Sequence, residues 1–328
     1  MANGGSSALS IRSILVATTA EARHLERLHS AFPDLDVRTS DWPPSPEDLA
    51  TVDAAVVWTV EPEWLEAAPG LRWIHVGGAG VERLPLAEIR RHGTILTNSS
   101  GVHVPNIPEH VLALMLAFAR RLPQLLAAQR ERRWRDDETH GEVFELSGQT
   151  LLLVGMGDIG LGTGERAAAL GLRVIGYRRR ADEPPPAFVS QVFGPADLHE
   201  ALGLADHVLV SLPLTSATRG MIDEAALAAM RPGSYFYNVG RGAVVNQEAL
   251  VAALASGHLG GAGLDVTDPE PLPPDSSLWS AANVIITAHT SGATPHYWDR
   301  AIELVVENIR RLRAGEELVN RVDLDTGY

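Results

Sequence analysis

The segment of residues 151–177 constrains the fold of this chain more than any other. Its first apolar run, residues 151–154, predicts a buried strand, and residues 172–177 predict a second one after an alanine-rich helix. The loop between the first strand and the helix reads GMGDIG. A strand, a glycine loop, a helix and a strand within about thirty residues are typical of a dinucleotide-binding unit.

The three glycines of this loop suit a dinucleotide. Gly155 would allow the tight turn, Gly157 would let the backbone approach the pyrophosphate, and Gly160 would let the helix pack close to the strand. The start of the helix would offer free N–H groups to the phosphates. A glycine turn without any ligand is the structural alternative.

The end of the second strand bears on the choice of cofactor. Asp or Glu usually binds the ribose 2′-hydroxyl of NAD at this place, but here Arg178, Arg179 and Arg180 follow the strand. Arginine can bind a 2′-phosphate through two parallel hydrogen bonds. We therefore predict that NADP(H) is preferred and that NAD(H) remains possible. The alternative is a solvated basic loop before the turn at residues 181–186.

Composition excludes several kinds of chemistry. The net charge of −14 argues against a nucleic-acid or anionic-membrane surface. The chain has no cysteine, which excludes disulfides, thiolate nucleophiles and cysteine metal sites. All 27 basic residues are arginine, so a phosphate-binding lysine and Schiff-base chemistry are excluded as well.

The N-terminal segment gives no sign of export. Residues 1–10 lack the charged region and apolar core of a secretion signal, and no apolar run approaches about eighteen residues. We expect a cytoplasmic protein that does not enter the membrane, with the first ten residues disordered.

Apolar strands alternate with helices along the whole chain, which predicts parallel sheets. Before the glycine loop we expect strands at 13–17, 54–59, 71–76 and 94–97, helices at 21–29 and near Glu63, and one helix at 108–133. After it we expect strands at 207–211, 235–238, 263–266 and 284–287, and helices at 223–230, 247–256 and 294–314. The amphipathic last helix would return to the N-terminal strands.

This order predicts an α/β protein with two Rossmann-like, doubly wound domains. The dinucleotide-binding domain, residues 102–292, would be inserted in a discontinuous substrate-binding domain made of residues 11–101 and 293–328. The substrate would bind between them.

Three further motifs follow predicted strands: NVGRG at 238–242, DVTDPEP at 265–271 and AHTSG at 288–292. In this order, and with GMGDIG, they resemble the D-isomer-specific 2-hydroxyacid dehydrogenase family, which includes glyoxylate/hydroxypyruvate reductases and D-3-phosphoglycerate dehydrogenases. The resemblance extends from about Ile14 to Leu312.

The resemblance implies a catalytic set. Arg241 would bind the carboxylate and carbonyl oxygen of the substrate, His289 would donate the proton, and Glu270 would hold the second ring nitrogen of His289. Ala79 and Gly80 would bind the substrate carboxylate through their backbone amides. From spacing alone, the glycine loop at 77–80 is equally well explained as a tight packing turn.

The resemblance also implies where the cofactor lies. Asp265 would orient the nicotinamide amide, and neighbouring strand ends would line the path of the cofactor. The cofactor-binding residues that we expect are Gly155, Gly157, Asp158, Ile159, Gly160, Tyr177, Arg178, Arg179, Leu212, Pro213, Thr218, Val239, Gly240, Asp265, His289 and Gly292. Trp298, with Tyr297, would lie near the substrate or at a dimer contact, with packing as the alternative.

Ketone reduction by itself also requires an acid and a positively charged group of this kind. Hydride addition leaves negative charge on oxygen, which needs an acid and a positive charge nearby. Histidine exchanges protons near neutral pH, and a carboxylate beside it favours the charged imidazolium. Without the resemblance, the same residues could be a hydrogen-bonded structural histidine, a turn carboxylate and a surface arginine. No histidines stand at a convincing metal spacing, and we assign no metal.

We therefore predict an NADPH-preferring reductase that converts a small 2-oxoacid to the D-2-hydroxyacid. NAD-dependent oxidation of a D-2-hydroxyacid is the alternative within the enzymes. Nucleotide-dependent peptide binding, as in the C-terminal-binding-protein corepressors, is the alternative outside them. Arg178 and the chain length weigh against a phosphoglycerate dehydrogenase, and Glu270 weighs against the formate dehydrogenase branch.

The resemblance also implies a homodimer that forms through the dinucleotide domain. Residues 122–134 would contribute to this contact.

Overall fold

The computed structural model describes residues 10–134, 142–281 and 283–327, and it divides the chain into two compact units. The first unit contains the chain up to Val102 and again from Thr294, and the second contains His103–Ala293. The disorder predicted for the N-terminus falls on residues 1–9, which lie outside the described residues.

The first unit is built on a five-stranded parallel sheet with the order β2-β1-β3-β4-β5. Two of its three inner strands, β3 and β4, are buried along their whole length, because helices cover both faces of a parallel sheet. The strands are β1 (Ser13–Val16), β2 (Asp36–Thr39), β3 (Ala54–Val57), β4 (Trp73–Val76) and β5 (Ile95–Asn98).

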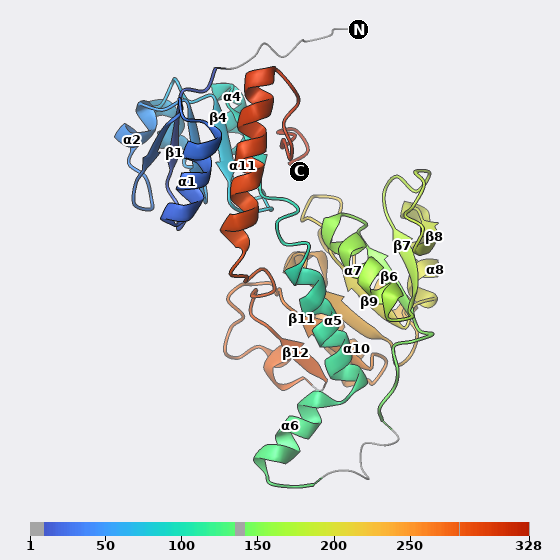
Figure 1. The fold of residues 1–328 in the computed structure, drawn as a ribbon. Helices are drawn as coiled ribbons and strands as arrows, with labels where there is room; N and C mark the ends of the chain where they lie inside the picture. The colour runs from blue at the N-terminus through green and yellow to red at the C-terminus, as the bar shows by residue number, and fades with distance from the viewer. Residues whose placement is uncertain (1–9, 135–141, 282, 328) are drawn as a thin grey trace. The chain divides into compact units, whose positions relative to one another are not determined.

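The last helix of the chain belongs to this first unit. It lies alongside α1 (Figure 1), and its apolar face shares one core with Ile14 and Leu28. Its amphipathic pattern explains this position, since Ile302, Val305 and Ile309 repeat at helical spacing and are all buried. The helices of the unit are α1 (Ala22–Ala31), α2 (Pro46–Ala50), α3 (Pro62–Ala67), α4 (Leu86–His92) and α11 (Tyr297–Ala314).

The second unit contains a seven-stranded parallel sheet with the order β12-β11-β10-β9-β6-β7-β8. The strand order reverses between β6 and β9, and ligands bind beyond the carboxyl ends of strands at such a switch point. The strands are β6 (Thr150–Val154), β7 (Arg173–Tyr177), β8 (Val189–Phe193), β9 (His207–Val210), β10 (Tyr235–Asn238), β11 (Gly261–Leu264) and β12 (Val284–Ile286).

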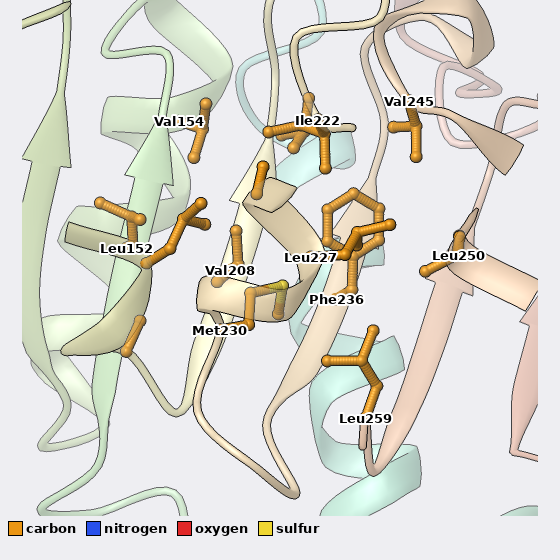
Figure 2. Close-up of a cluster of buried hydrophobic side chains, with 14 of the residues drawn as sticks. Leu152, Val154, Val208, Ile222, Leu227, Met230, Phe236, Val245, Leu250 and Leu259 are labelled. Carbon is orange, nitrogen blue, oxygen red and sulfur yellow. The ribbon is translucent and has the colours of Figure 1, made fainter. Parts of the chain in front are cut away.

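Helices cover this second sheet. The α-helices are α5 (Asn106–Ala119), α6 (Leu122–Arg130), α7 (Asp158–Ala169), α8 (Leu198–Gly203), α9 (Glu224–Ala229) and α10 (Gln247–Ala255), and the short 3-10 turns are η1 (Pro195–Asp197), η2 (Gly242–Val244) and η3 (Ser277–Ser280). Figure 2 shows Leu152, Val208 and Phe236, from three neighbouring strands, in one cluster with Leu227 and Met230 at the helix in front of them. The predicted α/β class with two parallel, doubly wound sheets is confirmed.

The prediction of one continuous helix over residues 108–133 is wrong. The structure has two helices there, α5 and α6, which bend by 68°. Pro123 explains the break, because its ring would clash with the carbonyl of Ala119 if the helix continued, and α5 ends at that residue. Arg121 turns the chain with a φ of 54°.

Sequence reasoning missed two edge strands, β2 and β8. The edge strand β2 is mostly exposed, and β8 has exposed residues in its middle, so neither shows the continuous apolar run of a central strand. The short helices α2, α4 and α8 were missed as well. Within the described residues no single helix is long and apolar enough to cross a membrane, although α5 and α6 together, across their bend, meet that test.

Among the described histidines, His75 in the first unit and His207 in the second are completely buried. The ring nitrogens of His75 lie 2.9 and 3.0 Å from the hydroxyl oxygens of Thr97 and Ser99, and the His207 Nδ1 lies 3.1 Å from the hydroxyl of Tyr237. Burial lowers the pKa of His75 and that of His207 from 6.5 to about 4. Both rings are therefore neutral in the folded protein near neutral pH.

We expect the free energy of unfolding to fall as the pH drops from 6.5 to about 4. The unfolded chain takes up these protons first, so the contribution of each histidine is complete above the unfolded pKa and is lost below it. The loss is at most roughly 3 kcal/mol per histidine. Melting curves at neutral and mildly acidic pH should show a smaller acid-induced fall in Tm for His75→Asn or His207→Asn than for wild type. The exposed control His199→Asn should behave as wild type, and an unreduced fall in both buried variants would contradict the assignment.

Candidate active site

The glycine loop after β6 has the geometry that a pyrophosphate needs. Gly155 has a φ of 106°, and its N–H donates to the carbonyl of Tyr177 over 3.1 Å. An added Cβ on Gly160 would lie 2.0 Å from the carbonyl oxygen of Gly155, whereas one on Gly157 would meet no described atom within 4 Å. The first turn of α7, which begins at Asp158, has no side-chain cap, so its amides are available to an anion.

The loops after β9 and β10 approach each other closely beside this site. An added Cβ on Gly240 would lie 2.7 Å from the carbonyl oxygen of Leu212. The hydroxyl of Thr218 donates to the carbonyl of Pro213 over 2.7 Å, and this bond holds the loop after β9 in place. Ser211, at the end of β9, donates its hydroxyl to the carbonyl of Gly155 over 3.1 Å. The predicted cofactor residues of β6, β9 and β10 therefore lie together at one edge of the sheet.

Arg178 lies at the same edge, after β7. Its backbone N–H donates to the carbonyl of Phe193 over 3.1 Å, which joins the ends of β7 and β8. The side chain is 17% exposed, and its Nη1 lies 3.7 Å from the Glu183 carboxylate. Its Nε is buried without a hydrogen-bond partner among the described residues. Arg179 is exposed.

His289 and Glu270 form a pair at the ends of β12 and β11. The Nδ1 of His289 lies 2.9 Å from Glu270 Oε2, while Glu270 Oε1 accepts a hydrogen bond from the Thr267 N–H over 3.1 Å. The histidine side chain is 52% exposed, and that of the glutamate 28%. The ring is thus held at Nδ1 and about half of the histidine side chain is exposed.

Asp265 holds the loop that carries His289. This carboxylate is buried and accepts hydrogen bonds from the Thr287 hydroxyl over 2.7 Å and from the N–H groups of Thr290 and Ser291 over 2.9 and 3.1 Å. The backbone at His289 has a φ of 56°, a conformation that costs free energy in a non-glycine residue. The network of Asp265 offsets that cost, so in this structure Asp265 positions the histidine.

Arg241 follows β10 and is half-buried. Its Nη1 donates to the carbonyl of Gly240 over 2.8 Å. Asn238 brackets the turn, because its Oδ1 accepts from the Gly240 N–H and its Nδ2 donates to the Arg241 carbonyl, both over 3.0 Å. Sequence reasoning assigned no role to Asn238, although it begins the NVGRG motif. Arg241, Glu270 and His289 thus follow three adjacent strands, β10, β11 and β12.

In the first unit, the glycine loop after β4 offers two exposed amides. The N–H groups of Ala79 and Gly80 donate to no acceptor within the described parts of the chain, and the carbonyl of Ala79 accepts from Asn98 Nδ2 over 2.7 Å. The hydroxyl of Tyr297 donates to the carbonyl of Gly77 at the start of the loop. The loop can therefore bind an anion through these backbone amides. A turn that served only for packing would not need free amides.

Aromatic side chains pack beside this loop. An added Cβ on Gly77 would lie 2.5 Å from ring carbons of Trp58, so only glycine fits under that indole. Trp58 is 36% exposed, whereas Trp298 is 8% exposed and donates its indole N–H to Thr19 over 3.1 Å. The burial of Trp298 favours the packing alternative for this residue.

Among the described residues, no three His, Asp or Glu side chains are arranged to hold a metal ion. The residues at the carboxyl edge of the seven-stranded sheet instead fit a dinucleotide. The open space at Gly157, the uncapped start of α7 and the partnerless Nε of Arg178 are the features that a phosphate group would use.

Comparison with known proteins identifies the family of this chain. Residues 112–291, more than half of the chain, match the NAD-binding domain of D-isomer-specific 2-hydroxyacid dehydrogenases. The chain belongs to the D-isomer-specific 2-hydroxyacid dehydrogenase family. It is 33% identical to a glyoxylate reductase of Korarchaeum cryptofilum over 94% of this chain and 95% of that protein.

Two further relatives frame the comparison. The chain is 35% identical to the D-3-phosphoglycerate dehydrogenase of Mycobacterium tuberculosis over 89% of its own length, but it spans only 56% of that relative. A solved NADPH-dependent glyoxylate/hydroxypyruvate reductase of Sinorhizobium meliloti, in complex with NADP and sulfate, is 30% identical over 96% of this chain and 99% of that one, with a TM-score of 0.80.

Proposed function

We propose that this protein reduces a small 2-oxoacid, such as glyoxylate, hydroxypyruvate or a branched or aromatic 2-ketoacid, to the D-2-hydroxyacid. The observation that carries the proposal is the 2.9 Å pair of His289 and Glu270, with Arg241 two strands away at the same sheet edge. Family membership supports the reaction class and the D configuration.

The three side chains divide the work of reduction. A bound nicotinamide would supply the hydride. His289 donates a proton to the substrate oxygen from Nε2, because its Nδ1 faces Glu270. The Glu270 carboxylate orients the ring through its contact with Nδ1. Arg241 offers a planar fork to the substrate carboxylate and to the oxygen on which charge develops.

In the first unit, the exposed amides of Ala79 and Gly80 would bind the substrate carboxylate. Initial rates against glyoxylate, hydroxypyruvate, pyruvate, phenylpyruvate and 2-ketoisocaproate, each with NADPH and NADH, test the function directly. If the protein bound nucleotide tightly but reduced none of these 2-oxoacids, the proposed function would be wrong.

NADPH is the preferred cofactor in this proposal, with NADH as a second one. Replacing Arg178 and Arg179 with alanine should raise the KM for NADPH roughly ten- to a hundredfold and change the KM for NADH by less than about threefold, because only NADPH carries the 2′-phosphate. Arg173→Ala, at the opposite end of the same strand, is the matched control. Equal effects on both cofactors would remove the assignment.

We also propose a homodimer formed through the dinucleotide unit of a cytoplasmic enzyme. The segment that begins α6 and continues past it exposes apolar side chains: Leu122 is 44%, Leu126 53% and Trp134 90% exposed. Such a surface is typical of a protein contact. Sedimentation of the purified chain should give twice its mass of 35.2 kDa, and a monomer mass would contradict the dimer.

A further inference from the structure

Arg178, one of the two arginines expected to bind the 2′-phosphate, already faces an anion of this chain. Glu183, in the turn between β7 and β8, places its carboxylate 3.7 Å from Arg178 Nη1 and 3.0 Å from Arg180 Nε. The backbone carbonyl of Glu183 also accepts a hydrogen bond from Arg178 Nη2. One glutamate therefore contacts two of the three consecutive arginines.

The side chain and the backbone of Glu183 act differently on Arg178. The carbonyl holds one end of the guanidinium in place whatever the carboxylate does. The carboxylate only occupies the space beside the fork, because its 3.7 Å separation exceeds that of a hydrogen bond, and Arg178 Nε stays without a described partner. The fork is thus partly neutralised but its hydrogen-bonding capacity is not used up.

The Glu183 carboxylate can leave this position easily. Its side chain is 43% exposed, and it lies in a turn outside both neighbouring strands. An ion pair this accessible to solvent contributes little to stability. A phosphate carries more charge and more acceptor oxygens than a carboxylate, so it can replace Glu183 on the arginines.

We propose that Glu183 is a specificity-determining residue that competes with the 2′-phosphate of NADP(H) for Arg178. Binding of NADP(H) displaces the carboxylate, and this displacement weakens the affinity for NADP(H). NAD(H) has no phosphate at that position, so the ion pairs stay intact when it binds. Glu183 thus narrows the difference in affinity between NADP(H) and NAD(H), so one site can bind both cofactors. This inference rests on the proposed cofactor site.

The neighbouring Asp182 provides a matched control. It carries the same charge one residue away in the same turn, it is exposed, and neither of its carboxylate oxygens forms an ion pair with a described residue. Glu183→Gln and Asp182→Asn remove the same formal charge from the same loop. Only the first removes a carboxylate from the arginines, so the two variants separate local competition from the general effect of net charge.

The experiment measures binding by fluorescence titration of wild type, Glu183→Gln and Asp182→Asn. The ligands are NADPH, NADH and the fragments 2′,5′-ADP and 5′-AMP, which lack the nicotinamide and need no turnover. In Glu183→Gln we expect Kd for NADPH and for 2′,5′-ADP to fall about three- to tenfold, with NADH and 5′-AMP within about twofold of wild type. Asp182→Asn should stay within about twofold for all four ligands.

Two results would overturn the inference. Equal tightening in both variants would mean that net charge alone acts, and unchanged or weaker binding of 2′,5′-ADP in Glu183→Gln would mean that the carboxylate does not compete. The proposed cofactor preference fails separately, if wild type binds 2′,5′-ADP no more tightly than 5′-AMP. A preference that appears only in Glu183→Gln would then support the competition and refute the preference of the wild type.

Discussion

Replacing His289 with asparagine is expected to lower kcat roughly 10²- to 10⁴-fold, the usual contribution of a general acid. Asparagine keeps a polar side chain but cannot deliver a proton at neutral pH. The affinity for NADPH should fall much less than kcat, because the glycine loop and Arg178, which would bind the phosphates, follow β6 and β7. Steady-state kinetics and a separate nucleotide titration measure the two effects.

The control for this variant is His199→Asn, which removes an exposed histidine of the same unit. It should keep wild-type kcat. If His289→Asn retained more than about a tenth of the wild-type kcat, the proton would have to come from another group, since loss of a general acid costs far more than that.

The partner of His289 should show a different signature. Glu270→Gln keeps the size of the side chain and a hydrogen-bond acceptor for Nδ1, whereas Glu270→Ala removes that acceptor. Because the ring is held through this contact, kcat should fall further in Glu270→Ala than in Glu270→Gln, and less in either than in His289→Asn, which loses the acid itself. Steady-state kinetics of the three variants measure the order, and equal kcat values in the two Glu270 variants would contradict a role of the hydrogen bond in holding the ring.

The sequence predicted the elements that carry continuous apolar runs or glycine loops. β10 was predicted at its observed bounds, and the motif residues around Gly155, Arg241 and His289 lie after strands as expected. Buried parallel strands must be apolar throughout, and each tight turn after them needs particular residues, so both leave a local signal. Edge strands such as β2 leave none.

Side-chain partners were harder to predict, because they depend on segments that meet only in the folded chain. The role of Asp265 in holding the His289 loop requires that β11 and β12 be neighbours, and the burial of Trp298 requires α11 to lie on the first sheet. Asn238 lies inside a motif, yet its two hydrogen bonds to the Gly240 N–H and the Arg241 carbonyl depend on how the backbone turns after β10. The contact of Glu183 with the arginines likewise depends on the conformation of one turn.

Replacing Arg241 with alanine is expected to lower kcat/KM for the 2-oxoacid roughly 10²- to 10³-fold, as loss of a charged donor to a developing oxyanion does. The KM should rise because the guanidinium would bind the substrate carboxylate in the ground state, and kcat should fall because it would also stabilise the carbonyl oxygen in the transition state. Arg241→Lys should recover only part of the loss, since an ammonium group keeps the charge but lacks the planar fork.

The position of Arg241 makes this test specific to the substrate. Its backbone is held by Asn238, whose bonds go to the Gly240 N–H and the Arg241 carbonyl, so truncating the side chain leaves the turn intact. Nucleotide affinity and Tm should therefore remain close to wild type in both variants. If Arg241→Ala weakened NADPH binding as much as it raised KM for the 2-oxoacid, the arginine would belong to the cofactor site, and the substrate carboxylate would depend on the exposed amides of Ala79 and Gly80 instead.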